Sequence, residues 1–210
     1  MSGPLNRVRR LSRKIGYRLG PRLMSALRKR WVLFRHPHAT IIFEGPVYLG
    51  PGFSLHIPDN GTFIVGPGVE FRRNFRAEIH GEGVIRIGGA CSFTYDAIVS
   101  CATKVEIGER CLLSHAFYLA DGNHRFRDFE VPVLQQGYNF REISIGDDVV
   151  VLSKCTVTNS IGTRSVIGAN SMVAHEIPPY CLAGGVPARV IEYFGPPGQE
   201  PGQSVAGSSS

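Results

Sequence analysis

No acidic residue occurs in the first 43 positions of this 210-residue chain, although these positions contain 11 arginines and lysines. The first acidic residue is Glu44, and the rest of the chain carries all 17 acidic residues with 12 of the 23 basic ones. The net charge of +6 therefore belongs to an N-terminal leader that precedes a mildly acidic domain. No base-reading motif accompanies the charge, so we expect no nucleic acid among the partners.

Long apolar runs and paired cysteines are also missing. No run approaches the roughly 18 apolar residues that a membrane span requires, and no secretory signal is expected at the N-terminus. The five cysteines are odd in number and form no Cys-x-x-Cys pair. This argues against a disulfide framework and favours a reducing compartment, so we expect a cytoplasmic protein.

Residues 1–40 predict a basic amphipathic helical leader. Apolar residues recur at helical spacing in two runs, Leu5, Val8, Leu11 and Ile15, then Leu23, Leu27 and Trp31. We expect one or two helices, with a break at Gly20-Pro21. Two interpretations stay open for residues 1–35: peripheral contact with the anionic inner face of a membrane, or packing on the domain or on a neighbouring subunit.

The rest of the chain divides into a β domain and a tail. Residues 41–194 are strand-rich, with Gly and Pro punctuating short runs of Val, Ile and Phe. Residues 195–210 contain Gly, Pro, Ser and Gln without periodicity and predict a disordered tail.

A repeat of six residues runs through the β domain. An aliphatic residue followed by Gly occurs at Leu49, Val65, Ile87, Ile107, Ile145, Ile161 and Ile167. Six residues after each comes another apolar residue, namely Leu55, Phe71, Phe93, Leu113, Val151, Ile167 and Val173. Three six-residue sides predict a triangular coil of about 18 residues with these side chains pointing inward. We therefore expect an all-β solenoid whose stacked coils pair as parallel strands.

The other positions of the repeat carry their own expectations. Gly beside the inward residue is expected to supply turn dihedrals that a Cβ would strain. A small residue stands four positions after the aliphatic one, and on this pattern Cys91, Cys111 and Cys155 are small buried hydrophobes rather than ligands. One corner is shortened between Val157 and Ile161. Residues 114–142 do not fit the repeat and predict a loop that leaves the coil.

At this point the sequence resembles the hexapeptide-repeat acyltransferases, most closely the maltose/galactoside-type and polysaccharide-biosynthesis O-acetyltransferases. Three segments carry the resemblance: Asp121-Gly122-Asn123-His124 followed by Val131-Pro132, ISIGDDVVV at 143–151, and VIGANSMVAHEIPPYCLAGGVPARVI at 166–191. The resemblance implies a left-handed parallel β-helix and a homotrimer with its site at the subunit interface. It also implies acetyl-CoA as donor, a saccharide hydroxyl as acceptor, and no metal.

The resemblance assigns the family's catalytic histidine to His124. An imidazole titrates near neutrality, so it can take the proton of a sugar hydroxyl and return it to the departing CoA thiolate. A surface loop histidine is the alternative, and His115 is the competing base, although a structural role is expected at its coil end. Asp121 and Asn123 are expected either to hold the imidazole or the acceptor or to form the local turn. Asp96 matches a position that binds the acceptor.

For the donor, the resemblance assigns the pantetheine path to Ser153, Ala169, Ala174 and His175, and the CoA phosphates to Arg189. The chain departs from the family at Val150-Val151-Leu152 and at Ala174-His175. Two other functions stay open. One, motivated by these departures, is a non-catalytic scaffold with a decayed donor site. The other is a zinc carbonic anhydrase using His80, His115 and His124, although the close histidine pair of that activity is absent.

Overall fold

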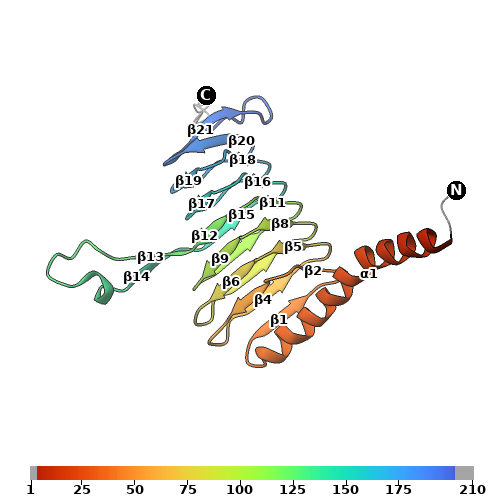
Figure 1. Ribbon diagram of the computed structural model, residues 1–210. Coiled ribbons are helices and arrows are strands. Elements are labelled where there is room, and N and C mark those ends of the chain that lie inside the picture. Colours follow the sequence, from red (N-terminus) through yellow and green to blue (C-terminus); the bar gives the residue numbers. More distant parts are fainter. Residues whose placement is uncertain (1–3, 202–210) are drawn as a thin grey trace.

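The computed structural model describes the backbone of residues 4–201 and the side chains of residues 20–201. One long helix, α1 (Pro4–Arg35), precedes a column of stacked coils. Figure 1 shows α1 against the first coils, a hairpin projecting from the middle of the column, and the last strands at its far end. Residues 202–210, most of the predicted tail, lie outside the described part of the chain.

Three parallel sheets form the three faces of the column. The first face contains β1 (Thr40–Phe43), β4 (Thr62–Val65), β7 (Val84–Ile87), β10 (Lys104–Ile107) and β15 (Ile143–Ile145). The second contains β2 (Tyr48–Leu49), β5 (Glu70–Arg73), β8 (Ser92–Tyr95), β11 (Leu112–Leu113), β16 (Val150–Val151), β18 (Val166–Ile167), β20 (Cys181–Gly185) and β21 (Ala188–Tyr193). The third contains β3 (Ser54–His56), β6 (Arg76–Ile79), β9 (Ile98–Cys101), β12 (Tyr118–Ala120), β17 (Thr156–Val157) and β19 (Met172–Val173). Only β21 runs antiparallel to its neighbour, β20, among these described strands.

The coils become shorter along the column. In the first coil Thr40 pairs with Thr62. A slightly shorter step joins Ser92 to Leu112, and the shortest joins Val150 to Val166. The expected uniform coil of about 18 residues is thus corrected. The reason lies partly on the first face, where longer strands such as β1 and β4 give way to single bridged residues at Ile161 and Ile177.

The inward column that the repeat predicts is confirmed. Each aliphatic residue of the repeat is at most 2% exposed, and the apolar residues six positions later are buried as well. The first coils are filled by a phenylalanine cluster, Phe63, Phe71, Phe75 and Phe93, whose members are all fully buried. The coils after the hairpin are filled by valine, isoleucine, alanine and cysteine. Coil length and core composition therefore change together.

The repeated glycines have a different reason from the one that the sequence predicts. Gly88 does not have a positive φ; the left-handed residue of that corner is Ala90, with φ 58°. A Cβ added at Gly88 would lie 2.7 Å from the backbone carbon of Gly108 in the next coil, closer than real Cβ contacts allow. In the same way, a Cβ added at Gly146 would lie 2.5 Å from the backbone nitrogen of Thr163. These glycines are needed for the close approach of stacked coils, not for turn dihedrals.

The cysteines at the small-residue positions are buried thiols, as expected. Cys91 donates its thiol hydrogen to the carbonyl of Gly108 at 3.0 Å, Cys111 to Gly146 at 3.2 Å, and Cys155 to Gly168 at 3.1 Å. Each acceptor is the turn carbonyl of the next coil. These cysteines therefore link successive coils and are accounted for as structural residues.

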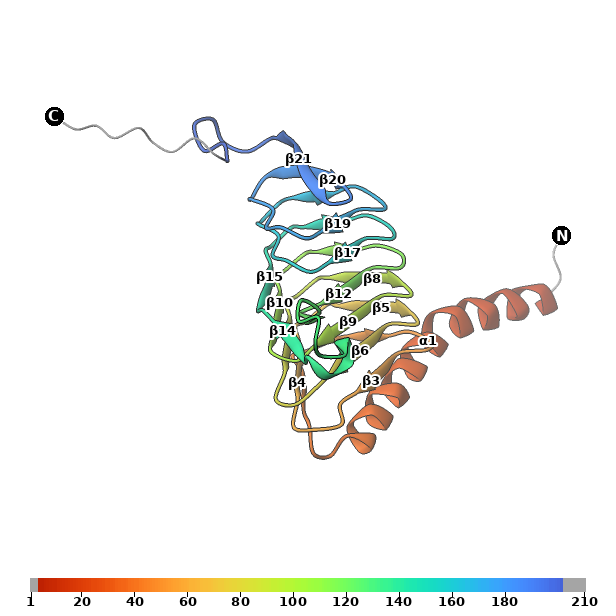
Figure 2. The same ribbon diagram turned by 90° about the vertical axis from the view of Figure 1, so that its left-hand side faces the viewer.

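Helix α1 continues through Gly20-Pro21, so the predicted break is wrong. Figures 1 and 2 show that the helix bends near its middle instead, which is the usual effect of an internal proline. The half after Pro21 is held by the first coil, because Ser25 Oγ accepts from Leu49 N at 2.8 Å and Arg28 donates to Leu49 O at 2.9 Å. Within the described part, no helix is long and apolar enough to cross a membrane.

The excursion from the coil is shorter than the expected 114–142. Strand β12 lies on the third face, with Leu119 fully buried six positions after Leu113. The chain leaves the column only after β12 and returns at β15. Between them it forms β13 (Gly122–His124), the short 3-10 helix η1 (Val133–Gln135) and β14 (Tyr138–Phe140). The spacing of buried residues continues through β12 although Ser114 stands where the repeat usually has glycine, and Ala116 has the left-handed corner conformation, with φ 54°.

Candidate active site

His124 lies on the projecting hairpin, in β13. It stands opposite Tyr138 of the antiparallel strand β14, and the two ring centroids are 4.3 Å apart. The side chain of His124 is exposed, and the planes of the two rings are tilted by 37° to each other. Asn123, also exposed, stands opposite Asn139 in the same hairpin. The arrangement presents His124 and Asn123 on a supported arm, away from the inward column.

Asp121 has a different environment from its two neighbours. Its carboxylate is 5% exposed and accepts hydrogen bonds from Ala102 N at 2.9 Å, and from Thr103 N at 2.7 Å and Oγ1 at 2.9 Å. These contacts fix the point where the hairpin leaves the column, which is the local turn role left open from the sequence. The predicted contact of Asp121 with the imidazole or the acceptor stays a prediction. Cys101 is buried nearby, and burial raises the pKa of its thiol to about 12, with the Asp121 carboxylate adding to the effect.

A continuous line of residues, the corner ridge, runs along the edge between the second and third faces. It consists of Pro51, Arg73, Tyr95, His115, Ser153 and Ala169, each one coil further along. The next residue on each coil donates its backbone N–H to the ridge carbonyl one coil earlier, as Asp96 does to Arg73 at 2.9 Å and Asn170 to Ser153 at 2.9 Å. The same residues, Asn74, Asp96, Ala116, Lys154 and Asn170, all have positive φ.

The corner ridge brings three of the predicted binding residues onto one edge. Ser153 and Ala169 are successive members of the ridge, and Asp96 follows Arg73 and Tyr95 at its N-terminal end. Asp96 accepts a hydrogen bond from Asn74 Nδ2 at 2.8 Å and stays exposed. Arg189 is exposed on β21 and pairs with Gly184 of β20, at the same corner of the last coil.

The other predicted residues lie on the opposite edge of the third face. Ala174 and His175 follow β19 directly, at the edge from which the chain after β12 also departs toward His124. A strand of four residues spans about 13 Å, which separates this edge from the corner ridge. Within one chain, the structure therefore does not bring His124 together with Asp96, Ser153 or Ala169.

His115, the competing base, is a member of the corner ridge. Its Nδ1 lies 3.2 Å from Thr94 Oγ1, and its ring meets that of Tyr95 edge-on, with centroids 4.8 Å apart. These contacts fit the structural role expected from the sequence. They also leave the imidazole exposed midway between Asp96 and Ser153.

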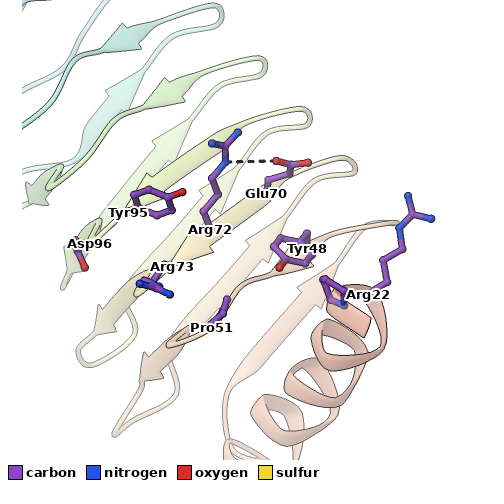
Figure 3. Close-up of a pocket in the computed structure, with 9 residues that line it drawn as sticks. Arg22, Tyr48, Pro51, Glu70, Arg72, Arg73, Tyr95 and Asp96 are labelled. Atoms are coloured by element: carbon purple, nitrogen blue, oxygen red, sulfur yellow. Dashed lines mark ion pairs between the residues drawn. The ribbon is translucent and has the colours of Figure 1, made fainter. Parts of the chain in front are cut away.

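A groove beside the corner ridge contains residues that the sequence analysis does not single out. It has a volume of about 1230 Å³ between α1 and the second face, and it is lined by Pro21, Arg22, Tyr48, Pro51, Glu70, Arg72, Arg73, Tyr95 and Asp96. Figure 3 shows Arg72 with its ion-pair partner Glu70 on one strand and Tyr95 on the next. The signal that could have found the groove is the pairing of Arg73 with Tyr95 in the following coil. A uniform coil of about 18 residues, as expected from the repeat, would not pair Arg73 with Tyr95, so the sequence analysis does not place them side by side.

The three histidines proposed for a zinc site lie apart in the single chain. His80 faces the ring of His56, with centroids 6.0 Å apart, while His115 packs on Tyr95 and His124 on Tyr138. Among the residues described, no group of three or more histidine, cysteine or acidic side chains is placed to hold a metal ion.

The sequence of the chain is similar to those of known acetyltransferases. No protein-family profile matches the chain. The chain is 30% identical over 173 residues to the galactoside O-acetyltransferase of Escherichia coli, covering 80% of this chain and 70% of that protein. It is 31% identical over 169 residues to a probable acetyltransferase of Mycobacterium tuberculosis, covering 77% of this chain but only 55% of that protein.

Among solved structures, the fold is similar to that of a hexapeptide-repeat acetyltransferase of Vibrio cholerae complexed with acetyl-CoA. The TM-score is 0.58 at 22% identity, and the match covers 81% of this chain and 79% of the other. This likeness concerns the fold, and the left-handed parallel β-helix expected from the sequence is confirmed.

Proposed function

The chain belongs to the hexapeptide-repeat acetyltransferases, and we propose that it transfers an acetyl group from acetyl-CoA to a hydroxyl group of a saccharide or glycolipid precursor. The similarity to a galactoside O-acetyltransferase over most of both chains supports the saccharide acceptor. The observation that carries the proposal is His124, exposed on a hairpin and supported by Tyr138.

The proposed mechanism needs no covalent enzyme intermediate. His124 takes the proton of the acceptor hydroxyl as the oxygen attacks the thioester carbonyl, and then gives that proton to the CoA thiolate. Asn123 and Asp96 contact the acceptor. Ser153 and Ala169 bind the pantetheine along the corner ridge, with Ala174 and His175 on the opposite edge, and Arg189 contacts the CoA phosphates.

A homotrimer completes this site, because the two edges of the third face carry its two halves. The hairpin exposes large apolar side chains that its own column does not cover, including Phe129 at 94% and Leu134 at 84%. Exposed apolar surface of this kind favours a partner, and a second copy would bring His124 to the corner ridge of its neighbour. Light scattering should then give a mass three times the 23.0 kDa of one chain.

Thiol release from acetyl-CoA with a panel of sugars and nucleotide sugars tests the transfer. We expect His124→Ala to lower acceptor-dependent release by about 10²- to 10⁴-fold, the usual contribution of a general base. His80→Ala is the matched control, because His80 lies on the column and contacts only His56 among the described aromatic rings. Full release by His124→Ala would move the base to His115. No thermal shift with CoA would favour the scaffold alternative.

A second proposal concerns α1, which we infer contacts an anionic membrane surface from the cytoplasmic side. The helix packs on the first coil through Ser25, Arg28 and Val32. Its opposite face exposes an apolar stripe at helical spacing, consisting of Leu23, Leu27, Trp31 and Phe34, with Trp31 59% and Phe34 77% exposed. Two exposed basic residues of the described half, Arg30 and Arg35, flank the stripe. Apolar and basic residues together suit an anionic lipid surface.

Co-sedimentation with vesicles tests this contact. Leu27→Ser with Trp31→Ser should abolish binding to phosphatidylglycerol vesicles, and the parent should bind phosphatidylcholine vesicles weakly. Unchanged binding by the double variant would remove the proposal. A smaller oligomer in the variant would instead assign the stripe to subunit packing.

A further inference from the structure

The groove between α1 and the second face has more arginine than its own carboxylates can neutralise. Arg22, Arg72 and Arg73 line it together with Glu70 and Asp96. Arg72 lies 3.9 Å from Glu70, a distance at which the guanidinium keeps most of its donors available. Asp96 accepts a hydrogen bond from the neutral amide of Asn74 through Oδ1 and forms no ion pair among the described residues, so the groove holds three arginines and two carboxylates. Among the side chains described, neither Arg22 nor Arg73 forms an ion pair.

The local charge balance strengthens this excess. Residues 1–43 contain no acidic side chain, so α1 brings only positive charge to the groove wall. Guanidinium groups bind phosphate and carboxylate oxygens through paired hydrogen bonds, which are stronger than bonds between neutral groups. A groove with unpaired arginines is therefore suited to an anionic ligand.

Two tyrosines add flat surfaces to the same groove. Tyr95 is 41% exposed and its ring makes a T-shaped contact with the ring of His115. Tyr48 is half-buried beside α1. Aromatic faces with a few charged groups at fixed positions are the usual lining of sites for small organic ligands. The volume of about 1230 Å³ exceeds the needs of a bare inorganic ion and admits a sugar with its substituent.

The corner ridge connects this groove to the proposed donor positions. Arg73 and Tyr95 are followed by His115, and then by Ser153 and Ala169. Adjacent coils are about 4.8 Å apart, so Tyr95 and Ser153 are separated by about 10 Å. A saccharide lying along the ridge can thus keep one end in the groove while another hydroxyl approaches the thioester.

We propose that this groove binds the anionic group, phosphate or carboxylate, of a charged saccharide acceptor, with Arg72 and Arg73 on the anion and Tyr95 against the sugar ring. The inference rests on the proposed acetyl transfer and names the class of its acceptor. Arg22 on α1 closes the groove from the opposite side, so the leader takes part in acceptor binding.

Calorimetry on the full-length protein tests the groove directly, with glucose 1-phosphate, glucuronic acid and methyl glucoside as probes. We expect at least one anionic probe to bind about tenfold more tightly than methyl glucoside, with an affinity that falls as salt is added. The stronger of the two anionic probes distinguishes phosphate from carboxylate. Arg72→Gln with Arg73→Gln should weaken that binding about tenfold or more, and Arg73→Lys in an otherwise native chain should retain part of it.

Arg86→Gln is the matched control, because Arg86 is an exposed arginine of the first face that pairs with Glu44 at 3.8 Å, away from the groove. This variant should bind the probes as the parent does. Methyl glucoside binding as tightly as both anionic probes would overturn the proposal, as would native affinity in the double variant. Acetyl-CoA binding and thiol release, measured on the same samples, separate the two questions. Their absence with probe binding intact counts against the acetyl transfer, not against the anion site.

Discussion

The coils before the hairpin and the coils after it form two regions built to different sizes. Before the hairpin the coils are long, as the pairing of Thr40 with Thr62 shows, and the interior holds a stack of phenylalanines. After it the coils are short, as the pairing of Val150 with Val166 shows, and the interior holds valine, isoleucine, alanine and cysteine. The comparison shows that coil length sets the interior volume, and that the core residues follow the length.

The same difference separates the proposed acceptor groove from the proposed donor residues. The wide coils carry α1 and the arginine-lined groove, while the narrow coils carry Ser153, Ala169 and Arg189. Wide coils expose long corners on which a helix and a groove can form. Narrow coils stack with short corners and present backbone groups in register.

The largest expected effect comes from removing one aromatic ring of the wide coils. Phe71 is fully buried, with ring centroids 4.3 Å from Phe75 and 5.1 Å from Phe93. We expect Phe71→Ala to lower the free energy of unfolding by about 3–5 kcal/mol, because the ring is lost and a cavity remains. Val157→Ala in the narrow coils should cost about 1–3 kcal/mol. Urea unfolding of both variants measures the contrast, and equal losses would show that the two interiors are packed alike.

A smaller effect is expected at the glycines between coils. A Cβ at Gly88 meets backbone atoms of Gly108 at 2.7 Å, whereas a Cβ at Gly168 has its nearest contact at 3.5 Å. Gly88→Ala should therefore destabilise the protein by about 1–3 kcal/mol through overpacking. Gly168→Ala should stay within about 1 kcal/mol of the parent, since its backbone conformation suits alanine. Thermal unfolding followed by circular dichroism distinguishes them, and similar transitions would refute the close-approach explanation.

The smallest effect is a pH dependence at one buried thiol of the wide coils. The buried Cys101 thiol has a pKa raised from its ordinary value of 9.0 to about 12. Its contribution to stability is complete below pH 9, where the thiol is protonated in both folded and unfolded states. That contribution is lost as the pH rises from 9 toward 12, because only the unfolded chain ionises at first. The melting temperature of the parent should fall more between pH 8 and pH 10.5 than that of Cys101→Ala, and parallel curves would contradict the assignment.

The inward column could be predicted from the sequence because a period of six places one apolar side chain on each face. Coil lengths could not be predicted in the same way. They depend on corner residues such as those between His56 and Thr62, which follow no period. The positions of the repeated glycines follow from the sequence, but the expected reason for them is wrong. A glycine in a sequence can indicate either a left-handed φ or a close approach of two coils, and only the structure distinguishes the two.

The continuation of α1 through Pro21 also depends on contacts that lie outside its own sequence. Ser25 and Arg28 bind the backbone of Leu49, so the first coil holds the helix after the proline. The candidate site likewise depends partly on local sequence and partly on the folded structure. The motif that contains His124 was found in the sequence, but its distance from Ser153 is a property of the folded column, and the proposed closure of that distance requires a second chain.

The number of coils sets the length of the corner ridge. Every coil adds the same increment, one strand spacing of about 4.8 Å, to the separation between Arg73 at one end and Ala169 at the other. Insertion or removal of a whole coil changes that separation by one increment and leaves the chemistry at both ends untouched. The number of coils between Arg73 and Ala169 therefore sets the distance between the proposed acceptor groove and the proposed donor residues, and with it the length of acceptor that would fit.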